Sequence, residues 1–558
     1  MTPDQMRDLV RGQTVAGLFV NAVREFADRP ALRAAGGEVT WSYAEYGRQA
    51  ARVAAALRGL GVGPGDRVSL LMRNCPEFHA IDMGTLLLRA TPTSMYYSSA
   101  PEQIRYLVEQ VESRVVVADG PATLERLIAA RPYGGLPEHV IVLDDPQGSA
   151  GAEVLRYADL LGADALDLDA AAAAVCPEDI ATIIFTSGTT RPAKGARHSH
   201  AGMRAMVESL FMALGPDFRH KRLASYLPMA HIAERGNTLY LPLRAGHEVT
   251  TVGDVTALAQ ALPAVRPQYL FGPPRIWEKL WAGIQHVRAC AEVEPTVAEL
   301  LATVSLDAVE IAVTAAAAMP PTVLDGYWEL GLRLADGYGM TECGPGALDV
   351  RAPRVGTVGR VLPGTRIRLA EDGEIELDSA AMFAGYLNGP ERTAEVFTPD
   401  GWLRTGDVGS LDADGYLTLV DRKKDLIITA GGKNIAPTQI ESLLVRHPLV
   451  SSAVAIGEAR RYICALIVLD PLNVGPWAAA RGAAPDPVRL AENPDLLAEL
   501  QAHVDAVNAE LSRVEQVKRF AVLPGFWMPD SEELTPTMKV RRRVVTAKYD
   551  SLIETLYV

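Results

Sequence analysis

The chain has 558 residues, which is too long for one compact core and indicates two or more packed units. Apolar residues make up 48% of it and charged residues 22%, a balance that excludes a disordered or fibrous chain. The 54 basic and 68 acidic residues leave a net charge of −14, which opposes nonspecific binding to nucleic acid or to an anionic membrane surface, so a phosphate-bearing ligand would need a local site.

The chain shows no signal of export, membrane insertion or metal binding by cysteine. Its beginning lacks the basic start, apolar run and small-residue cleavage site of a secretory signal. No window approaches the roughly 18 uncharged apolar residues of a membrane span. We therefore expect a cytoplasmic protein with no integral membrane segment. The cysteines are scattered and never spaced as Cys-x-x-Cys, which favours neither a disulfide framework nor a zinc site: Cys75, Cys176, Cys290, Cys343 and Cys464.

The amino-terminal part alternates helix and strand patterns, as expected for α/β layers. Ser42 and Glu45 have capping-box spacing at the start of a helix that runs to about Arg58, and Arg67–Met72 is predicted to be a buried strand. The Ala-rich segment Asp167–Val175 is predicted to be a linker or weak helix. Similar units recur downstream, with a helix at Gln103–Val111 and strands at Arg114–Val117 and Ile180–Phe185.

The pattern changes toward the carboxy terminus. From Gly356 to Leu419 short alternating runs and glycine turns predict a small β-rich subdomain, with strands at Thr365–Leu369, Gly373–Leu377 and Gly415–Val420. An α+β region follows, with a helix near Pro437–Val445, strands near Ala453–Ile456 and Ile463–Leu469, and a helix near Pro494–Leu511. The apolar stripe of that last helix is Leu497, Leu500, Val504, Val507 and Leu511. We predict a large α/β amino-terminal domain, residues 1–421, and a small α+β carboxy-terminal domain, residues 422–558.

One polar loop directly follows the predicted strand that ends at Phe185. Its sequence, Thr186 to Gly195, combines hydroxyl residues, glycines and Lys194, and such a loop can surround phosphate oxygens with N–H and O–H donors. The spacing does not match that of the common GxxxxGK[ST] phosphate loop. On composition alone, a polar surface loop explains the segment as well.

Four further segments carry candidate groups. In Asp336–Glu342 a tyrosine could stack on a base and a carboxylate could hold a magnesium ion, although a glycine turn with a core tyrosine explains the pattern too. In Gly401–Asp407 the aspartate could accept hydrogen bonds from ribose hydroxyls, or it could only cap a turn. Asp421–Pro437 contains a charged turn and a glycine-rich loop, and Pro536–Lys539 precedes a basic stretch that solvent alone could explain.

In this order, the five segments resemble the adenylate-forming superfamily of acyl-CoA synthetases, adenylation domains and luciferases. The likeness covers almost the whole chain. Gly65–Val68 and Pro92–Val111 resemble the amino-terminal part of long-chain acyl-CoA synthetases. Leu227–Arg235 and Phe271–Leu280, together with Asp421–Pro437, are also similar to that long-chain branch.

The resemblance implies a ligase that joins a carboxylate to AMP, releases pyrophosphate and passes the acyl group to CoA, with ATP, Mg²⁺ and a small-molecule acid as its ligands. Lys539 matches the catalytic lysine that bridges the carboxylate and the α-phosphate. Glu342 matches the magnesium-linked carboxylate, and Thr341 a phosphate-side hydroxyl. His231 matches the segment beside the acyl carboxylate, where an imidazole can orient the substrate; a hydrogen-bonded core histidine remains the alternative.

The resemblance also assigns the remaining site residues. The small domain is implied to turn about Lys424 between the two half-reactions, which would bring Gly431, Gly432 and Lys433 to the CoA channel. The nucleotide-binding residues are Thr186, Ser187, Gly188, Thr189, Thr190, Arg191 and Lys194 at the phosphates, Tyr338 and Gly339 at the base, and Asp407 and Arg422 at the ribose. The acyl pocket is formed by Ala315, Ala316, Ala317 and Trp277, although a large aromatic such as Trp277 is more often a core residue.

The sequence departs from the family pattern at two places. Arg191 stands where the phosphate loop usually has glycine, and Ala193 where it usually has proline, so the loop path is altered or Arg191 adds a charged contact to the phosphates. The second departure is Thr314–Pro320, with four alanines where Ser-Gly-Gly-Ala-Pro is usual. Added methyl groups predict a narrower acyl site.

Two other functions remain open. A few relatives of long-chain synthetases activate nitrite with ATP to diazotise an aromatic amine, without CoA, and the altered acyl-side loop permits this chemistry. A non-catalytic nucleotide-binding or acyl-binding homologue is the alternative from another class. The match of Lys539, Glu342, Asp407 and Arg422 speaks against it, because a mere binder needs no lysine from a second domain. The sequence leaves the oligomeric state open.

Overall fold

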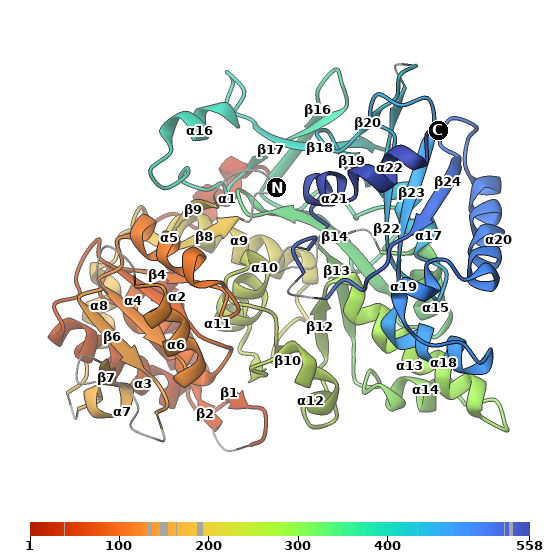
Figure 1. Ribbon diagram of the computed structural model, residues 1–558. Helices are drawn as coiled ribbons and strands as arrows, with labels where there is room; N and C mark the ends of the chain where they lie inside the picture. Colours follow the sequence, from red (N-terminus) through yellow and green to blue (C-terminus); the bar gives the residue numbers. More distant parts are fainter. Residues whose placement is uncertain are drawn as a thin grey trace.

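The computed structural model describes residues 1–37, 40–131, 137–145, 154–162, 164–186, 193–317, 319–431, 433–528, 531–534 and 540–558. Figure 1 shows two layered sheets in the amino-terminal two thirds of the chain, a smaller β-sheet above them and the carboxy-terminal part packed along one side. Among the described residues, no helix combines the length and apolar character needed to cross a membrane.

The first large sheet has seven strands in the order β7-β6-β5-β3-β4-β8-β9. All neighbours are parallel except β8 and β9, which pair antiparallel. The valine run of β5 is buried at every position, as expected where helices cover both faces of a parallel sheet. The strands are β3 (Arg67–Leu71), β4 (Thr91–Ser94), β5 (Val115–Ala118), β6 (His139–Val142), β7 (Val154–Arg156), β8 (Ile180–Thr186) and β9 (Lys194–Ser199).

The second large sheet has eight strands in the order β15-β14-β13-β12-β10-β11-β1-β2. Antiparallel pairs stand at its two edges, β14 with β15 and β1 with β2. Its strands are β1 (Pro30–Ala34), β2 (Thr40–Ser42), β10 (Arg222–Ser225), β11 (Glu248–Thr251), β12 (Tyr269–Gly272), β13 (Ile311–Ala315), β14 (Leu334–Met340) and β15 (Gly344–Leu348).

The largest hydrophobic core joins the two sheets through the helices between them. It contains side chains of Phe19, Phe78 and Val207 together with Leu70 from the first sheet and Val249 from the second. Ser42 caps the helix that begins at Tyr43, as predicted, by accepting the Glu45 N–H at 3.2 Å. The principal helices are α2 (Val15–Glu25), α3 (Tyr43–Gly59), α4 (Pro76–Leu86), α5 (Pro101–Val111), α6 (Pro121–Ala129), α8 (Leu168–Ala174), α9 (His200–Leu214), α12 (Leu258–Val265), α13 (Pro274–Cys290) and α15 (Pro321–Glu329).

Shorter helices connect these elements. They are α1 (Pro3–Leu9), α7 (Tyr157–Leu160), α10 (Ile232–Glu234), the π-helical turn η1 (Arg235–Tyr240), α11 (Leu241–Ala245), the 3₁₀ turn η2 (Val255–Ala257) and α14 (Val297–Thr303). The π-helical turn follows the His231 segment directly. Such turns are rare and are often found at functional sites.

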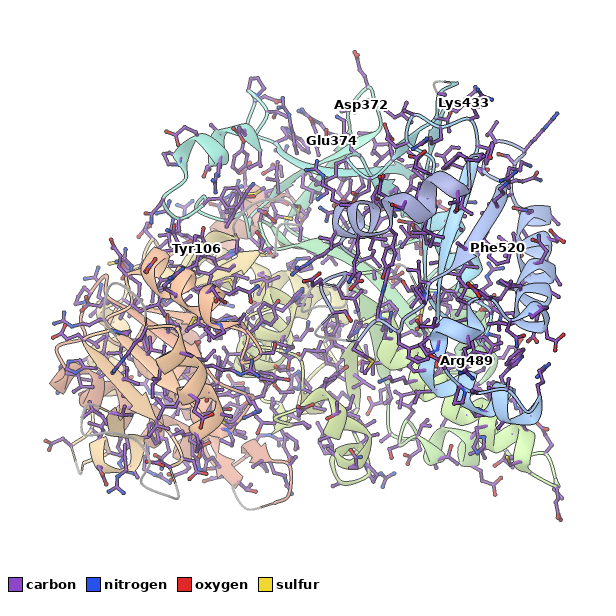
Figure 2. The ribbon with its side chains drawn as sticks, viewed as in Figure 1. Tyr106, Asp372, Glu374, Lys433, Arg489 and Phe520 are labelled. Carbon is purple, nitrogen blue, oxygen red and sulfur yellow. The ribbon has the colours of Figure 1, made fainter. Side chains whose placement is uncertain are left out.

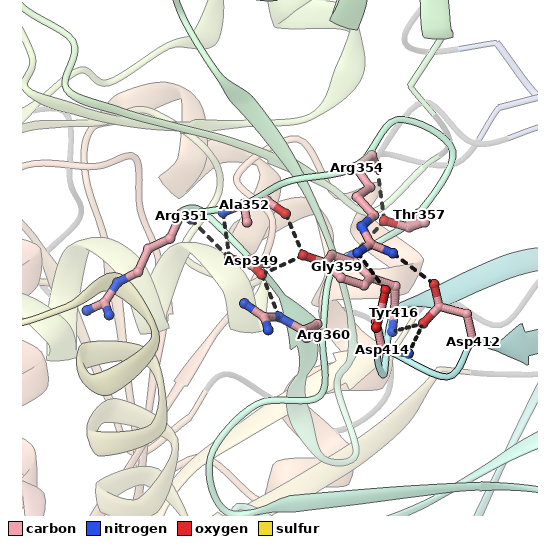
Figure 3. A network of polar contacts seen from close by, with 10 residues as sticks. All are labelled: Asp349, Arg351, Ala352, Arg354, Thr357, Gly359, Arg360, Asp412, Asp414 and Tyr416. Atoms are coloured by element: carbon pink, nitrogen blue, oxygen red, sulfur yellow. Dashed lines mark hydrogen bonds and ion pairs between the residues drawn. The ribbon is translucent and has the colours of Figure 1, made fainter.

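The predicted β-rich subdomain is an antiparallel sheet in the order β16-β17-β18-β19, with the helix α16 (Pro390–Glu395) beside it. Its strands are β16 (Thr365–Leu369), β17 (Glu374–Ser379), β18 (Leu403–Leu411) and β19 (Leu417–Arg422). Figure 3 shows how its β18–β19 turn is fixed to the loop after β15: Tyr416 donates to Ala352 O at 2.7 Å, and Arg354 stacks on the Tyr416 ring and binds Asp412 and Asp414. This network ties the subdomain to the second large sheet.

The carboxy-terminal part has its own buried clusters, and each contains only residues from 427 onward. The stripe predicted on α20 is confirmed at Leu500, Val504 and Val507, but Leu496 rather than Leu497 is the fully buried residue at its start. The elements are β20 (Ile427–Ile428), β21 (Asn434–Ile435), α17 (Pro437–Leu444), β22 (Val450–Ile456), β23 (Ile463–Leu469), α18 (Pro471–Ala480), α19 (Pro487–Leu490), α20 (Pro494–Glu510), β24 (Val517–Val522), α21 (Arg542–Lys548) and α22 (Asp550–Thr555).

Candidate active site

Three of the residues assigned to the nucleoside meet although they are far apart in the sequence. The Tyr338 hydroxyl on β14 donates to Asp407 Oδ2 at 2.6 Å, and Arg422 Nε at the end of β19 lies 2.7 Å from Asp407 Oδ1. Tyr338 and Asp407 are almost buried, whereas nearly half of the Arg422 side chain is exposed. The tyrosine ring and the carboxylate are therefore placed next to each other, with the guanidinium at their solvent side.

The β18–β19 hairpin produces this arrangement. Asp407 and Arg422 are direct partners in its antiparallel register, and the register shifts between Val408 and Gly409. The Asp407 N–H donates to Thr405 Oγ1 at 3.0 Å, which fixes the backbone before the carboxylate. Burial, followed by the negative charge of Asp407, raises the pKa of Tyr338 well above its usual value, so this hydroxyl remains a donor.

A second group joins Glu342 to the end of the predicted phosphate loop. The Tyr386 hydroxyl donates to Glu342 Oε1 at 2.6 Å, and Lys194 Nζ lies 4.7 Å from the centre of the Tyr386 ring. The main chains are joined as well, because Phe383 N–H donates to Glu342 O at 2.8 Å. Glu342 is 8% exposed. Its carboxylate is thus held between the subdomain and β9.

Tyr386 was not predicted as a site residue. Its contacts come from an isolated bridge that pairs it with Ala196 on β9, about 190 positions earlier in the chain. The local sequence, Gly385 and Tyr386 before the turn at Asn388–Pro390, resembles an ordinary loop. Only the tertiary pairing shows that this hydroxyl reaches Glu342.

The phosphate loop is described at its two ends. Thr186 and Lys194 are direct partners in the antiparallel β8–β9 pair, and Thr186 Oγ1 donates to Lys194 O at 3.4 Å. Ser187, Gly188, Thr189, Thr190 and Arg191 lie outside the described residues, as do Gly432 and the catalytic candidate Lys539.

The alanine segment lies beside the Tyr338 strand. In the parallel register of β13 and β14, Thr314 pairs with Asp336 and Ala315 with Gly337. Ala316 and Ala317 are exposed, and Ala316 has φ = +77°, a conformation that favours glycine. Burial raises the pKa of the neighbouring Asp336 to about 8, although the Gly337 and Met319 N–H groups oppose the shift.

Trp277 is not part of this surface. Its side chain is 0% exposed, and its indole N–H contacts Gly272 O and Val313 O at 3.2 Å each. Tyr327 packs against the ring and donates to Trp277 O. We therefore correct the prediction that Trp277 lines an acyl pocket: in this structure it is a core residue of the layer between α13 and α15.

His231 is the N-cap of α10 and is partly exposed, unlike a core histidine. Its Nδ1 accepts the Ala233 N–H at 3.2 Å. Glu234, three residues on, is buried and accepts hydrogen bonds from Ser225 at 2.8 Å and Thr238 at 2.9 Å, while Asn74 lies at 3.4 Å. Burial raises the pKa of Glu234 to about 7. The polar cluster beneath His231 thus anchors this segment.

The neighbouring residue, Arg235, forms an ion pair in the core. Its guanidinium binds Asp82 and donates to Ser94 Oγ and Tyr240 Oη at 2.7 Å each, and both ionic side chains are fully buried. Removing one partner of such a buried ion pair strongly destabilises the folded protein, because the other charge is left buried and uncompensated. The π-helical turn after His231 is therefore held rigidly against α4.

The other assigned residues lie on the surface near the end of β19. Lys424, Gly431 and Lys433 are exposed, and the Thr429 N–H donates to Lys433 O at 3.0 Å within the glycine-rich turn. Gly339 follows Tyr338 within β14, and Thr341 lies in the turn between β14 and β15. Within the described ranges, His, Cys, Asp and Glu residues nowhere gather in threes to form a metal site of their own.

Comparison with known families identifies the class. The AMP-binding enzyme model matches residues 19–387, and the AMP-binding enzyme C-terminal domain model matches residues 424–558. The chain belongs to the AMP-binding enzyme family. The predicted resemblance to adenylate-forming enzymes and their long-chain acyl-CoA synthetase branch is confirmed, and so is the mixed α/β fold with a smaller carboxy-terminal part.

Its relatives include two mycobacterial proteins. The putative fatty-acid–CoA ligase fadD11 of Mycobacterium tuberculosis is 40% identical over 448 residues, which cover 72% of this chain and 78% of the relative. The long-chain-fatty-acid–CoA ligase FadD15 of the same organism is 33% identical over 566 residues, 92% of each chain. Among solved structures, the M. tuberculosis fatty acyl CoA synthetase is 25% identical with a TM-score of 0.65, covering 97% of this chain and 99% of that one. An anthranilate CoA ligase in complex with anthranoyl-AMP shares the fold, with a TM-score of 0.78 at 19% identity and coverages of 98% and 99%.

Proposed function

We propose that this protein is an ATP-dependent carboxylic acid:CoA ligase that forms an acyl-adenylate, releases pyrophosphate and transfers the acyl group to CoA. The observation that carries the proposal is the meeting of Tyr338, Asp407 and Arg422 from three separate strands, in a chain of the AMP-binding enzyme family. Its relatives named as fatty-acid–CoA ligases support the CoA-dependent reaction.

The nucleoside is held by side chains whose geometry is described above. Asp407 accepts hydrogen bonds from the ribose hydroxyls, because an ionised carboxylate is an acceptor with several lone-pair positions. Arg422 pairs with Asp407 and adds a donor at the solvent side. Tyr338, next to Gly339, presents its ring to the base.

The phosphates bind between β9 and the turn after β14. We assign the loop from Thr186 to Lys194 to the phosphates: Lys194 supplies a positive charge, and the Thr186 hydroxyl joins the two ends of the loop by donating to Lys194 O. Glu342 and Thr341 fit a magnesium ion shared with the phosphates, because Mg²⁺ prefers hard oxygen donors and is usually bound by one or two carboxylates plus substrate phosphates. When bound, this ion would neutralise charge on the phosphates. Tyr386 orients the Glu342 carboxylate for that purpose.

Lys539 supplies the positive charge at the reacting centre. A carboxylate is a weak nucleophile and the α-phosphorus is shielded by negative oxygens, so an ammonium bridging both lowers the barrier. Among the described residues nearest to it, Leu534 pairs with Val540, and the Arg541 N–H donates to Glu533 O at 2.7 Å. His231, at the start of α10, orients the acid.

We further propose that residues 1–421 and 422–558 act as two domains. Their buried clusters have no residue in common across this boundary. The smaller domain turns about Lys424 between the half-reactions. In the second orientation, Gly431, Gly432 and Lys433 line the path of CoA, and Lys539 is withdrawn.

The acid is proposed to be a fatty acid, because the relatives cited above are named for that substrate class. The exposed alanines Ala316 and Ala317, with the half-buried Ala315 before them, form one wall of its pocket. Nitrite activation receives no comparable support from these relatives.

A substrate panel tests the proposal. Pyrophosphate release is measured with fatty acids of different length, aryl acids, and nitrite with an aryl amine, each with and without CoA. We expect release with fatty acids and an acyl-CoA product only when CoA is present. Pyrophosphate release with nitrite and an aryl amine that does not depend on CoA would contradict the proposal of a CoA ligase. ATP binding without pyrophosphate release from any acid would favour a non-catalytic homologue.

A further inference from the structure

Lys423 directly precedes Lys424, about which we propose that the smaller domain turns. It binds the amino-terminal body with both its side chain and its main chain. Its Nζ lies 2.6 Å from Asp372 Oδ2 and 2.8 Å from Glu374 Oε2. Its main-chain N–H donates to Gly406 O at 2.8 Å. Figure 2 shows Asp372 and Glu374 at the end of the subdomain where β16 turns into β17.

These contacts close a ring. Glu374 uses its second oxygen, Oε1, to accept the Gly406 N–H at 3.0 Å, so Gly406 is bound by Glu374 at its N–H and by Lys423 at its carbonyl. Asp372 Oδ1 accepts the Glu374 N–H at 3.1 Å and fixes the turn that carries both acids. The Glu374 side chain is only 10% exposed. We call Asp372, Glu374, Gly406 and Lys423 the boundary clamp.

Each end of the boundary clamp is one residue away from a nucleoside contact. Gly406 precedes Asp407, and Lys423 follows Arg422. Asp407 and Arg422 are register partners and form the 2.7 Å ion pair described above. Any shift of Gly406 or Lys423 along the strands therefore moves the carboxylate or the guanidinium that meets the ribose.

The charge of Lys423 is needed to keep the ring closed. Without the ammonium, the carboxylates of Asp372 and Glu374 face each other as like charges, and Glu374 is too buried for water to compensate fully. The two acids in turn raise the pKa of Lys423, so the ammonium stays charged. A neutral side chain at 423 would keep the main-chain bond to Gly406 O, but it would leave Glu374 without the ammonium that holds its carboxylate against the Gly406 N–H.

We propose that Lys423 is a positioning residue for nucleotide binding. Through Glu374 and Gly406 it holds Asp407 and Arg422 in register. The same contacts keep the chain attached to the amino-terminal body up to the residue before Lys424. The inference rests on the proposed function, because it assumes that the nucleoside binds at Asp407. Lys423 does not touch the nucleotide itself.

The substitution Lys423→Met tests the boundary clamp, because methionine keeps the apolar stem and the main-chain N–H but removes the charge. We expect the affinity for AMP, measured by isothermal titration calorimetry, to fall about three- to fivefold, as for loss of a partly exposed ion pair. The KM for ATP in pyrophosphate exchange should rise by the same factor while kcat stays within about twofold. Lys423→Arg, which keeps the charge, should restore both values.

A matched control comes from another lysine pair. Lys221 Nζ lies 2.5 Å from Glu310 Oε2, away from the nucleoside contacts, and Lys221→Met should leave AMP affinity unchanged. In the double variant Lys423→Met/Glu374→Gln, the two losses should not add, because both open the same ring. An unchanged AMP affinity in Lys423→Met, or an equal loss in Lys221→Met, would overturn the inference.

The AMP measurement also separates this inference from the proposed function. It needs neither acid nor CoA. If no acid supports pyrophosphate release but Lys423→Met still weakens AMP binding, the ligase proposal fails and the boundary clamp stands. If the wild-type enzyme makes acyl-CoA and Lys423→Met binds AMP normally, only the inference on Lys423 fails.

Discussion

At the scale of single residues, the hydroxyl of Tyr386 holds the carboxylate that we assign to magnesium. Tyr386→Phe removes only this donor and keeps the ring beneath Lys194. Because a hydrogen bond to a charged group contributes about 1.5–3 kcal/mol, we expect the KM for Mg-ATP to rise by at least about tenfold. Steady-state kinetics at varied Mg²⁺ measures this effect. Binding of Mn²⁺ with a non-hydrolysable ATP analogue, followed by electron paramagnetic resonance, should weaken in parallel; normal Mn²⁺ binding would contradict the assignment.

Ala316 adopts a backbone conformation in which a methyl group is unfavourable. Glycine relieves a strain of about 1–2 kcal/mol but loses about 0.5–1 kcal/mol in chain entropy. Ala316→Gly should therefore raise the free energy of unfolding slightly, by about 0–1.5 kcal/mol, and widen the range of acids that give pyrophosphate. Urea denaturation and the acid panel check the two parts. Ala317→Gly is the control, since φ at Ala317 is not positive; an equal gain in stability there would speak against strain at Ala316.

Lys539 is assigned by resemblance alone, and kinetics can test it directly. Loss of one electrostatic donor of this type typically slows the chemical step about 10²–10³-fold. We expect Lys539→Ala to lose this much in pyrophosphate release from acid and ATP, but much less in thioester formation from a supplied acyl-adenylate. Equal losses in both assays would contradict a role specific to the first half-reaction, and an unchanged rate of pyrophosphate release would place Lys539 outside it.

At the scale of elements, the polar cluster around Glu234 makes the stability of the His231 segment depend on pH. The pKa of Glu234 is raised from about 4.5 to about 7 in the folded chain. The folded state therefore binds the proton more tightly than the unfolded state, and the contribution to stability is greatest below pH 4.5 and is lost as pH rises toward 7. Glu234→Gln cannot titrate. As pH rises from 5 to 8, the unfolding free energy of the variant minus that of wild type, measured in urea, should increase by about 2 kcal/mol. A pH-independent difference would show that Glu234 does not titrate in this range.

Most elements could be predicted from local patterns, and the differences have local reasons. The helix at Ser42 and the strands of the β-rich subdomain follow from capping and alternation, which depend on neighbours in sequence. The start of the α20 stripe was shifted by one residue, because Leu496 and Leu497 are both apolar and only packing selects between them. The pocket role of Trp277 is wrong for a related reason: a large aromatic can line a pocket, although it is more often a core residue, and the hydrogen bonds to Gly272 and Val313 decide for the core.

At the scale of the whole molecule, the sequence contains the site residues but not the contacts between them. Tyr338, Asp407 and Arg422 could be named from motifs, whereas their direct contact depends on how β14 lies against the β18–β19 hairpin. Tyr386 and Glu374 were missed because each acts through a partner far away in the chain, Glu342 in one case and Lys423 in the other. Residues that position others carry no chemical motif of their own, so a pattern of residue types cannot single them out.

The two sets of buried clusters, one on each side of residue 422, have a practical consequence for how the protein melts. Where cores share no side chains, heating need not disrupt them together, and differential scanning calorimetry should resolve two transitions. AMP should raise only the transition temperature of residues 1–421, because all the contacts proposed for AMP except Arg422 lie in that segment. The carboxy-terminal segment could then be exchanged with that of a mycobacterial relative as a cassette, joined after Lys423, without rebuilding either hydrophobic interior.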